Sequence, residues 1–349
     1  MKISAGLTLG RFRPRTAVLL SGAAAAAAAL AVAGCSAGGG TSADSLALSG
    51  STSGTAALAA AVAGNYQVLT LNDAKDRTFN QLLGINNEGQ IAGYFGSGAA
   101  GHPNKGYVLR PPYAQGDFGN ENVPGSAQTQ VIGINDAGVT VGFFSGQNAA
   151  NPADDNNFGF WRSSNGRFHT VAFPTRSNSK PPVNQLLGIN DTGTAVGFYN
   201  DSAGNSHGYA FSIRSGKFKP ITVPGATSVT AASINNHGTA AGFFTSAKGE
   251  VDAFLQFHGG KTTTLAFPGA SATQAFGVND SDEVVGTYNT GTGNAAVTHG
   301  FTWMNGKFTT VDFPKASSTT INGVNDEGDI VGFYTDAAGN TDGFVGLPS

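Results

Sequence analysis

Short apolar and β-branched runs alternate with polar, glycine-rich segments along residues 66–349. Successive copies of one phrase place their asparagines 49, 55, 45, 44 and 46 residues apart. A near-constant period of this size indicates a repeat architecture, and we number the repeats 1 to 6 by these phrases. In each phrase an aliphatic residue stands between a small residue and an asparagine: Gly84-Ile85-Asn86, Gly133-Ile134-Asn135, Gly188-Ile189-Asn190, Ser233-Ile234-Asn235, Gly277-Val278-Asn279 and Gly323-Val324-Asn325.

Each repeat contains four apolar runs, which predict four short β-strands. In repeat 2 the first run is 129–135 and the last is 168–173. The connector after the phrase reads Asn/Asp-x-Gly in five repeats, and glycine suits the left-handed position of a three-residue hairpin loop. Repeat 5 has Asp282 there, and aspartate tolerates this geometry better than most residues. Four antiparallel strands in 44 to 55 residues are typical of a propeller blade.

The two ends of the repeat region predict how the blades close. Residues 66–71 resemble a fourth strand that precedes the first phrase, and residues 342–346 resemble a third strand with no fourth after it. Each strand type then occurs six times, so the N-terminal strand must complete the last blade. The sequence therefore predicts an all-β fold over 65–349, a six-bladed β-propeller of four-stranded antiparallel blades. Its ring is closed by strand 66–71 joining the last blade.

The first 34 residues predict a targeting segment. Lysine and arginine occur before the apolar run 17–33, and no acidic residue does. The run ends in Val32-Ala33-Gly34-Cys35, which resembles the bacterial lipobox, in which cleavage precedes a cysteine that carries the lipid. Cys35 is the only cysteine in the chain, so lipidation would also remove a free exposed thiol. An ordinary secretory peptide and a retained membrane anchor are the alternatives.

Residues 35–64 are mostly Gly, Ser, Ala and Thr, which is typical of a flexible linker. Removal of 1–34 leaves 15 basic and 22 acidic residues, a net charge of −7, and no basic cluster. This charge argues against nucleic acid as a partner. We expect an exported bacterial lipoprotein of the cell envelope, held at the membrane by the lipid on Cys35. Ser36 after the cysteine favours the outer membrane or cell surface, and we expect a monomer.

The repeated phrases resemble those of the bacterial extracellular HAF-repeat family, whose units join Gly-Ile-Asn-Asp-x-Gly-x-Val-Val-Gly to a later His-Gly/Ala-Phe. The later motif is matched by His207-Gly208-Tyr209, His299-Gly300-Phe301 and Asp252-Ala253-Phe254. Other residues replace the histidine in four of the six repeats. The resemblance covers 66–349 and implies an exported repeat protein without established catalytic residues.

Neutral polar residues occupy one position of every predicted first strand, five residues before the phrase asparagine: Gln81, Gln130, Gln185, Thr230, Gln274 and Thr320. If the first strands line the channel, these residues form a ring of amides and hydroxyls at one rim. The ring suits hydrogen bonding to an uncharged polar ligand such as a glycan. Alternatively, its groups satisfy backbone atoms between blades or hold channel water. It contains no carboxylate, histidine or lysine, so acid–base catalysis at this rim is disfavoured.

Other repeated residues predict structure rather than chemistry. An asparagine amide can bond to its own turn, so we interpret the six phrase asparagines as turn formers. Acidic loops at 154–157, 201–205 and 336–340 lack the spacing of a Ca²⁺ loop. We therefore predict no cofactor, with a structural calcium ion as the minor alternative. We interpret five repeated aromatic residues as packing between blades: Tyr94, Phe143, Phe198, Phe243 and Phe333.

Repeat 2 departs most from the common period, in its long loop 147–157 and its long connector 175–183. Propeller topology places both segments on the channel-rim face, and non-repeated loops on a regular scaffold usually carry specificity. We therefore predict that the specificity residues are Asp154, Asp155, Asn156, Asn157, Arg176 and Lys180.

The leading functional hypothesis is a non-catalytic, lipid-anchored propeller that binds a glycan or an envelope protein on its channel-rim face. An enzyme is the first alternative: a polysaccharide lyase, a hydrolase or a lactonase-like propeller. A purely structural envelope protein is the second. Acids converging on the rim would favour the enzyme, whereas a neutral amide or aromatic rim would favour binding.

Overall fold

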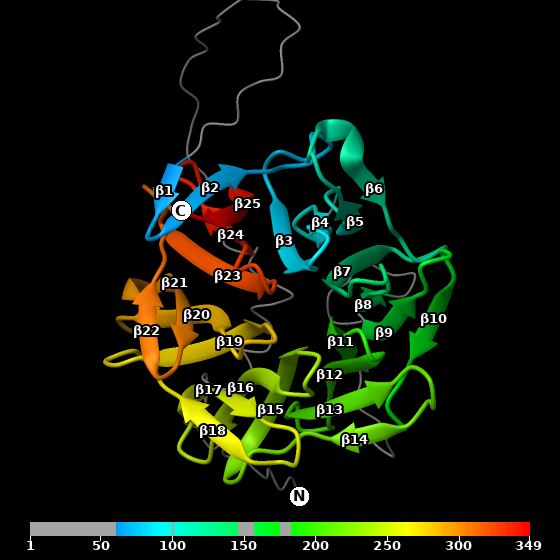
Figure 1. The fold of residues 1–349 in the computed structure, drawn as a ribbon, viewed down its shortest axis with the longest axis vertical. Helices are drawn as coiled ribbons and strands as arrows, with labels where there is room; N and C mark the ends of the chain where they lie inside the picture. Colours follow the sequence, from blue (N-terminus) through cyan, green and yellow to red (C-terminus); the bar gives the residue numbers. More distant parts are fainter. Residues whose placement is uncertain (1–60, 100, 146–156, 175–182) are drawn as a thin grey trace, which may run out of the picture.

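The computed structural model describes residues 61–99, 101–145, 157–174 and 183–349, which form an all-β fold (Figure 1). Helices in these ranges are short 3₁₀ turns, η1 (Gln115–Asp117) and η3 (Gly293–Ala295). None of them is long and apolar enough to cross a membrane. Several predictions fall outside the described residues, namely the leader 1–34, Cys35, most of the linker, Asp154, Asp155, Asn156, Arg176 and Lys180.

Four consecutive antiparallel strands form the sheet of each of the first three repeats. Repeat 1 contains β3 (Asn80–Ile85), β4 (Ile91–Phe95), β5 (Lys105–Leu109) and β6 (Phe118–Asn120). Repeat 2 contains β7 (Gln128–Ile134), β8 (Thr140–Ser145), β9 (Asn157–Arg162) and β10 (Phe168–Val171). Repeat 3 contains β11 (Asn184–Ile189), β12 (Thr194–Asn200), β13 (Ser206–Ser212) and β14 (Phe218–Pro220).

Repeats 4 and 5 keep the same order but share one eight-stranded sheet, because a single parallel bridge joins Val251 to Ala272. Repeat 4 contains β15 (Ala226–Ile234), β16 (Ala240–Ser246), β17 (Val251–Gln256) and β18 (Thr262–Leu265). Repeat 5 contains β19 (Ala272–Val278), β20 (Val284–Thr290), β21 (Val297–Met304) and β22 (Lys307–Thr310). Repeat 6 contains β23 (Ser318–Val324), β24 (Ile330–Thr335) and β25 (Thr341–Pro348).

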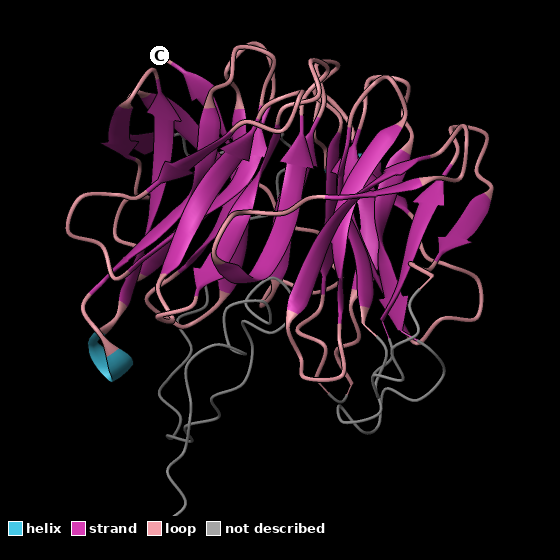
Figure 2. Cartoon of the chain, turned by 90° about the horizontal axis from the view of Figure 1, so that it is seen from below, coloured by secondary structure: helices cyan, strands magenta, loops and turns pink. Residues whose placement is uncertain are grey.

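The sheets surround a common centre, with the first strand of each repeat innermost (Figure 1), and loops emerge on both faces (Figure 2). Strand β2 (Tyr66–Thr70) pairs antiparallel with β25, in the place where the other repeats have their fourth strand. A further strand, β1 (Ala61–Ala63), pairs with the outer edge of β2. It lies within the range 35–64 that the sequence assigns to the linker.

The glycine of the repeated phrase is required where the inner strands approach one another. Each first strand contains a bulge just before this glycine, as between Leu82 and Gly84. A Cβ atom on Gly84 would lie 2.6 Å from the carbonyl oxygen of Ile132 in repeat 2. At the other end of the series, a Cβ atom on Gly323 would lie 2.8 Å from the carbonyl oxygen of Leu83 in repeat 1. The small residue therefore sets the spacing between neighbouring repeats.

The hairpin after each phrase has the predicted backbone geometry. The glycines of five repeats have positive φ angles, from 68° at Gly89 to 83° at Gly328. Asp282 adopts the same left-handed conformation in repeat 5, with φ 57°. The predicted tolerance of aspartate at this position is therefore confirmed.

The hydrophobic core lies between neighbouring sheets and around the centre. One cluster combines Leu82 and Ile91 of repeat 1 with Val331 and Val345 of repeat 6. The aromatic residues that the sequence assigns to packing belong to a central cluster with Leu83, and all but Phe333 are buried. The packing interpretation is therefore confirmed.

Candidate functional site

The predicted ring of amides and hydroxyls lies at the end where the first strands begin. Thr320 is half-buried, and the other five members are buried: Gln81, Gln130, Gln185, Thr230 and Gln274. The Gln81 side chain accepts a hydrogen bond from the Tyr94 hydroxyl at 2.7 Å. A ring buried to this degree offers no open surface in the described residues, so its role as a ligand rim stays a prediction.

Two members of the ring connect neighbouring repeats. Gln130 Nε2 donates to Asn104 Oδ1 of repeat 1 at 2.8 Å, and Gln185 Nε2 donates to Asn157 Oδ1 of repeat 2 at 2.9 Å. Asn157 is the one predicted specificity residue within the described ranges, and this contact places it beside the ring. Gln130 Oε1, Gln185 Oε1 and Gln274 Nε2 are buried and have no hydrogen-bond partner in the part of the chain that the structure describes. Each orphaned atom costs about 1–3 kcal/mol, so we expect water or a polar ligand there.

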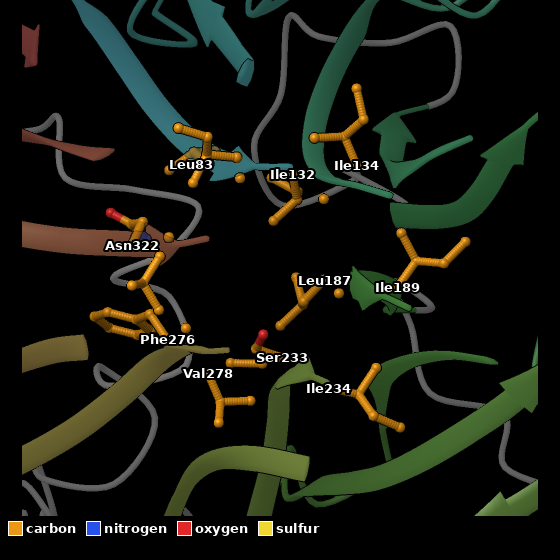
Figure 3. A pocket seen from close by; sticks show the side chains of 18 residues that line it. Leu83, Ile132, Ile134, Leu187, Ile189, Ser233, Ile234, Phe276, Val278 and Asn322 are labelled. Carbon is orange, nitrogen blue, oxygen red and sulfur yellow. The ribbon is translucent and has the colours of Figure 1, made fainter. Parts of the chain in front are cut away.

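The centre of the molecule is a narrow channel with a mainly apolar lining (Figure 3). At one position of the six first strands, three residues before the phrase asparagine, Asn322 is polar. The equivalent residues of the other five repeats are apolar: Leu83, Ile132, Leu187, Ala232 and Phe276. The cavity holds about 90 Å³. Water occupies ~30 Å³ per molecule, so this space suits a few waters and is too small for a sugar ring.

The phrase asparagines form their own turns, which confirms the prediction. Each side-chain oxygen accepts the N–H four residues later, as Asn86 Oδ1 does from Gln90 at 2.8 Å. Each Nδ2 also donates to the carbonyl of the next phrase asparagine. Asn325 donates to the Asn86 carbonyl at 3.5 Å. Sequence reasoning missed this link between repeats, because the acceptor lies one whole period away.

A second ring follows on the same face, from the residues after the asparagines: Asn87, Asp136, Asp191, Asn236, Asp280 and Asp326. The Oδ1 atom of each accepts the N–H of its counterpart in the preceding repeat, at 2.7–2.9 Å. Both amides also donate to the carboxylates on either side. These bonds account for the acidic ring as a connection between repeats. Within the described ranges no three His, Cys, Asp or Glu side chains are grouped to hold a metal.

A peripheral cavity of about 180 Å³ lies between repeats 3 and 4, and we call it the stack cavity. Phe173 and Tyr199 stack with their ring centroids 4.4 Å apart, and His207 stacks on Tyr199 at 5.0 Å. Tyr199 pairs with Asn184 at the start of β11. The cavity therefore opens on the face where the first strands begin, which is the face that the sequence assigns to the ligand.

The histidine of the stack is held by an acidic turn. His207 Nε2 lies 2.9 Å from Asp201 Oδ2, and the Asp201 carboxylate also accepts the N–H groups of Ala203 and Asn205. Burial raises the pKa of Asp201, but these hydrogen bonds outweigh burial and lower the pKa to about 2. The acidic loop 201–205 is therefore a hydrogen-bonded turn that orients one wall of the stack cavity.

Among the described residues the Tyr199 hydroxyl has no partner, because a proline stands in the adjoining strand where repeats 5 and 6 have threonine. In repeat 5 the equivalent tyrosine, Tyr288, bonds to Thr310 of the fourth strand at 2.9 Å. Repeat 6 has a corresponding tyrosine–threonine pair. Pro220 occupies this register position in repeat 3, and the Tyr199 hydroxyl makes no hydrogen bond within the described residues.

A backbone donor in the cavity wall also lacks its usual acceptor. In the five other connectors between repeats, the equivalent N–H donates to an asparagine or threonine side chain on the next first strand. Val229 takes that place in repeat 4. The N–H of Val223 consequently donates no hydrogen bond within the described part of the chain.

The residue before Val223 departs from the pattern as well. In repeats 1, 5 and 6 an asparagine or aspartate here accepts the N–H of the third-strand glycine. Repeat 3 has Thr222, whose hydroxyl makes no hydrogen bond in the described structure, so Gly208 lacks this acceptor. The stack cavity is thus bordered by polar groups that the other repeats use internally.

No protein-family model matches this chain, and no curated protein matches it. Among solved structures, AofleA from Arthrobotrys oligospora is similar with a TM-score of 0.50 and 14% identity, over 80% of this chain and 85% of that one. A putative TolB from Agrobacterium tumefaciens has a TM-score of 0.50 and 10% identity, over 83% and 100%. Both are propeller-type proteins, and likenesses at such low identity establish the fold class alone.

Proposed function

We propose that the chain is a six-bladed β-propeller with a closed ring. Three contacts between the last and first repeats support this: the pairing of β2 with β25, the approach of Gly323 to Leu83, and the bond from Asn325 to Asn86. Deleting residues 61–71 should lower the melting temperature sharply, because β25 would lose its outer partner, β2. An unchanged melting temperature would contradict closure.

The envelope location is part of the same proposal. The lipobox-like residues 32–35 support lipidation of Cys35 at the outer membrane or cell surface, and the repeated phrases support membership of the HAF-repeat family. Mass spectrometry of the mature N-terminal peptide should show acyl chains on Cys35. The Cys35→Ser variant should lack them. Acylation that persists in this variant would contradict the lipoprotein assignment.

The proposed activity is non-catalytic binding of a glycan, with one sugar residue seated in the stack cavity. The observation that carries it is the set of unused polar groups around an aromatic wall: the Tyr199 hydroxyl, the Thr222 hydroxyl and the Val223 N–H. A sugar ring combines apolar C–H faces with hydroxyls, so it suits a pocket with an aromatic wall and a few convergent polar groups. The volume of about 180 Å³ suits one sugar unit rather than a large ligand.

The test is a titration of the purified protein with neutral oligosaccharides, read by calorimetry and by the rise in melting temperature. Phe173→Ala should abolish binding, because it removes the outer ring of the stack. Phe267→Ala is the matched control, since Phe267 stacks on Tyr288 in repeat 5 with a centroid distance of 3.6 Å. Equal affinity in the two variants, or no binding by the wild type, would overturn the proposal.

A second candidate function is ester hydrolysis, which one arrangement in repeat 5 favours. Thr290 Oγ1 lies 3.0 Å from His299 Nε2, and His299 Nδ1 lies 2.8 Å from Asp312 Oδ2. This is the order of a hydroxyl nucleophile, a base and an orienting carboxylate. Turnover of p-nitrophenyl acetate that disappears in Thr290→Ala would support it. Equal rates for the variant and the wild type would exclude it.

A further inference from the structure

The stack cavity adjoins a second depression on the outer side of repeats 3 and 4, and one segment of the chain separates the two. This outer groove has a volume of about 480 Å³, and Pro220, Thr222 and Val223 line both spaces. Gln256 Nε2 donates to the carbonyl of Thr222 at 2.9 Å, which fixes the dividing segment in place. A ligand chain can therefore continue from one space to the other across this segment.

One basic side chain, that of Lys219, lines the outer groove of a protein whose overall charge is negative. In the sequence, Lys261, Lys217 and Arg214 occur one, two and five residues from the nearest lining residue. All four side chains are exposed, and none forms an ion pair with a described acidic residue. Residues 202–249 contain four basic residues and no acidic one. The attraction of these charges for an anion is not offset by neighbouring carboxylates on the same segment.

We propose that the ligand is an acidic glycan, whose neutral face packs in the stack cavity and whose next residue directs a carboxylate or sulfate towards Lys219. This rests on the proposed glycan binding and deepens it. The acidic group remains partly solvated in an open groove. Its pairing with Lys219 therefore adds selectivity and a faster encounter rather than most of the affinity.

The experiment uses uronate oligosaccharides from pectin and alginate, each paired with its carboxyl-reduced neutral counterpart, together with a sulfated galactan oligosaccharide. Calorimetry at low salt should show the acidic member of a pair binding about fivefold more tightly, a preference that fades in high salt. Tighter binding of the sulfated chain alone would assign the anion as a sulfate.

Lys219→Gln should remove the preference and leave the neutral affinity unchanged, whereas Lys219→Arg should keep it. Lys307→Gln is the control, because Lys307 is an exposed lysine on the fourth strand of repeat 5, away from the outer groove. Neutral members that bind as tightly as every acidic one would overturn this inference and leave the proposed function intact. Failure of every oligosaccharide to bind would overturn both.

Discussion

Repeats 3 and 5 present the same aromatic stack in two different states. Phe267, Tyr288 and His299 of repeat 5 stack as the aromatic rings of repeat 3 do. In repeat 5, however, Thr310 binds the tyrosine hydroxyl and Asp312 binds the histidine. The polar groups of repeat 5 are therefore hydrogen-bonded within the protein, whereas several of their counterparts in repeat 3 have no partner among the described residues.

The difference arises from side chains rather than from the path of the backbone. The connector after repeat 3 forms a turn with Ala226 N–H donating to the Val223 carbonyl at 3.1 Å. The connector after repeat 5 forms the same turn, from Ala316 to Phe313, at 3.2 Å. The same backbone conformation thus supports two kinds of junction between repeats: a filled junction, whose polar groups bond to one another, and an open junction, which leaves a cavity. A binding site in a repeat protein can arise where a few side chains shrink or lose a polar atom.

The largest expected effect is a loss of stability when the close approach of the inner strands, which all repeats share, is disturbed. Gly84→Ala should destabilise the whole fold by about 3 kcal/mol, because its Cβ would lie 2.6 Å from the backbone oxygen of Ile132, which cannot move freely. Thermal unfolding measures this. Ser233→Ala is the matched control, because repeat 4 already carries a side chain at this position, and it should change stability by less than about 1 kcal/mol. Equal stabilities for the two variants would show that the inner-strand spacing does not stabilise the fold.

The next prediction concerns a variant of repeat 3 that carries the two connector residues of repeat 5, aspartate and phenylalanine. In the double variant Thr222→Asp and Val223→Phe, the larger phenylalanine side chain should fill the stack cavity, and the carboxylate should accept the Gly208 N–H. We expect glycan affinity to fall by at least about thirtyfold, or roughly 2 kcal/mol, with the melting temperature unchanged or raised. Calorimetry and thermal unfolding on the same sample separate the two readouts. Retained affinity would place the binding site elsewhere.

Much of the fold could be predicted from the sequence, because the same strand and turn signals occur in each of the six repeats. The repeated Gly-Ile-Asn phrase predicted the turns. The sequence also predicted that Asp282 would take the left-handed conformation that glycine adopts in the other repeats. The links between repeats, such as Asn86 to Asn135, could not be predicted, because nothing within one repeat identifies an acceptor in the next. The stack cavity left a weak signal, a proline at residue 220 where four of the other five repeats have threonine. The consequence of this proline, a tyrosine hydroxyl without its usual partner, can be recognised only once Tyr199 is placed next to it in the structure.

A smaller effect comes from one change made in both repeats. Tyr199→Phe should weaken glycan binding about fivefold, or 1 kcal/mol, and leave stability unchanged, because the hydroxyl has no partner among the described residues. Tyr288→Phe should do the opposite. It should lower stability by about 1 kcal/mol through the lost bond to Thr310, without changing glycan affinity. If both variants behave alike, the distinction between an open and a filled junction fails.

The smallest effect concerns how each histidine is held. Repeat 3 uses Asp201 of a loop, whereas repeat 5 uses Asp312 after the fourth strand. The pKa of Asp201 is lowered from 3.8 to about 2, so the folded state binds its proton less readily than the unfolded state. Its contribution to stability is complete above about pH 5 and is lost as the pH falls from 4 towards 2.

The Asp201→Asn variant should therefore be less stable than the wild type at pH 5, by about 0.5–1 kcal/mol after allowance for solvent screening. The gap should narrow steadily as the pH falls to 2, where about half of the folded molecules have a protonated Asp201. Asp336→Asn is the control, because Asp336 accepts the same turn hydrogen bonds from Ala338 and Asn340 but has no histidine partner. Its gap should be smaller, and only Asp201→Asn should also weaken glycan binding, since it releases His207 from the stack. A gap that stays constant from pH 5 to pH 2 would show that Asp201 acts through the shape of the turn rather than through its charge.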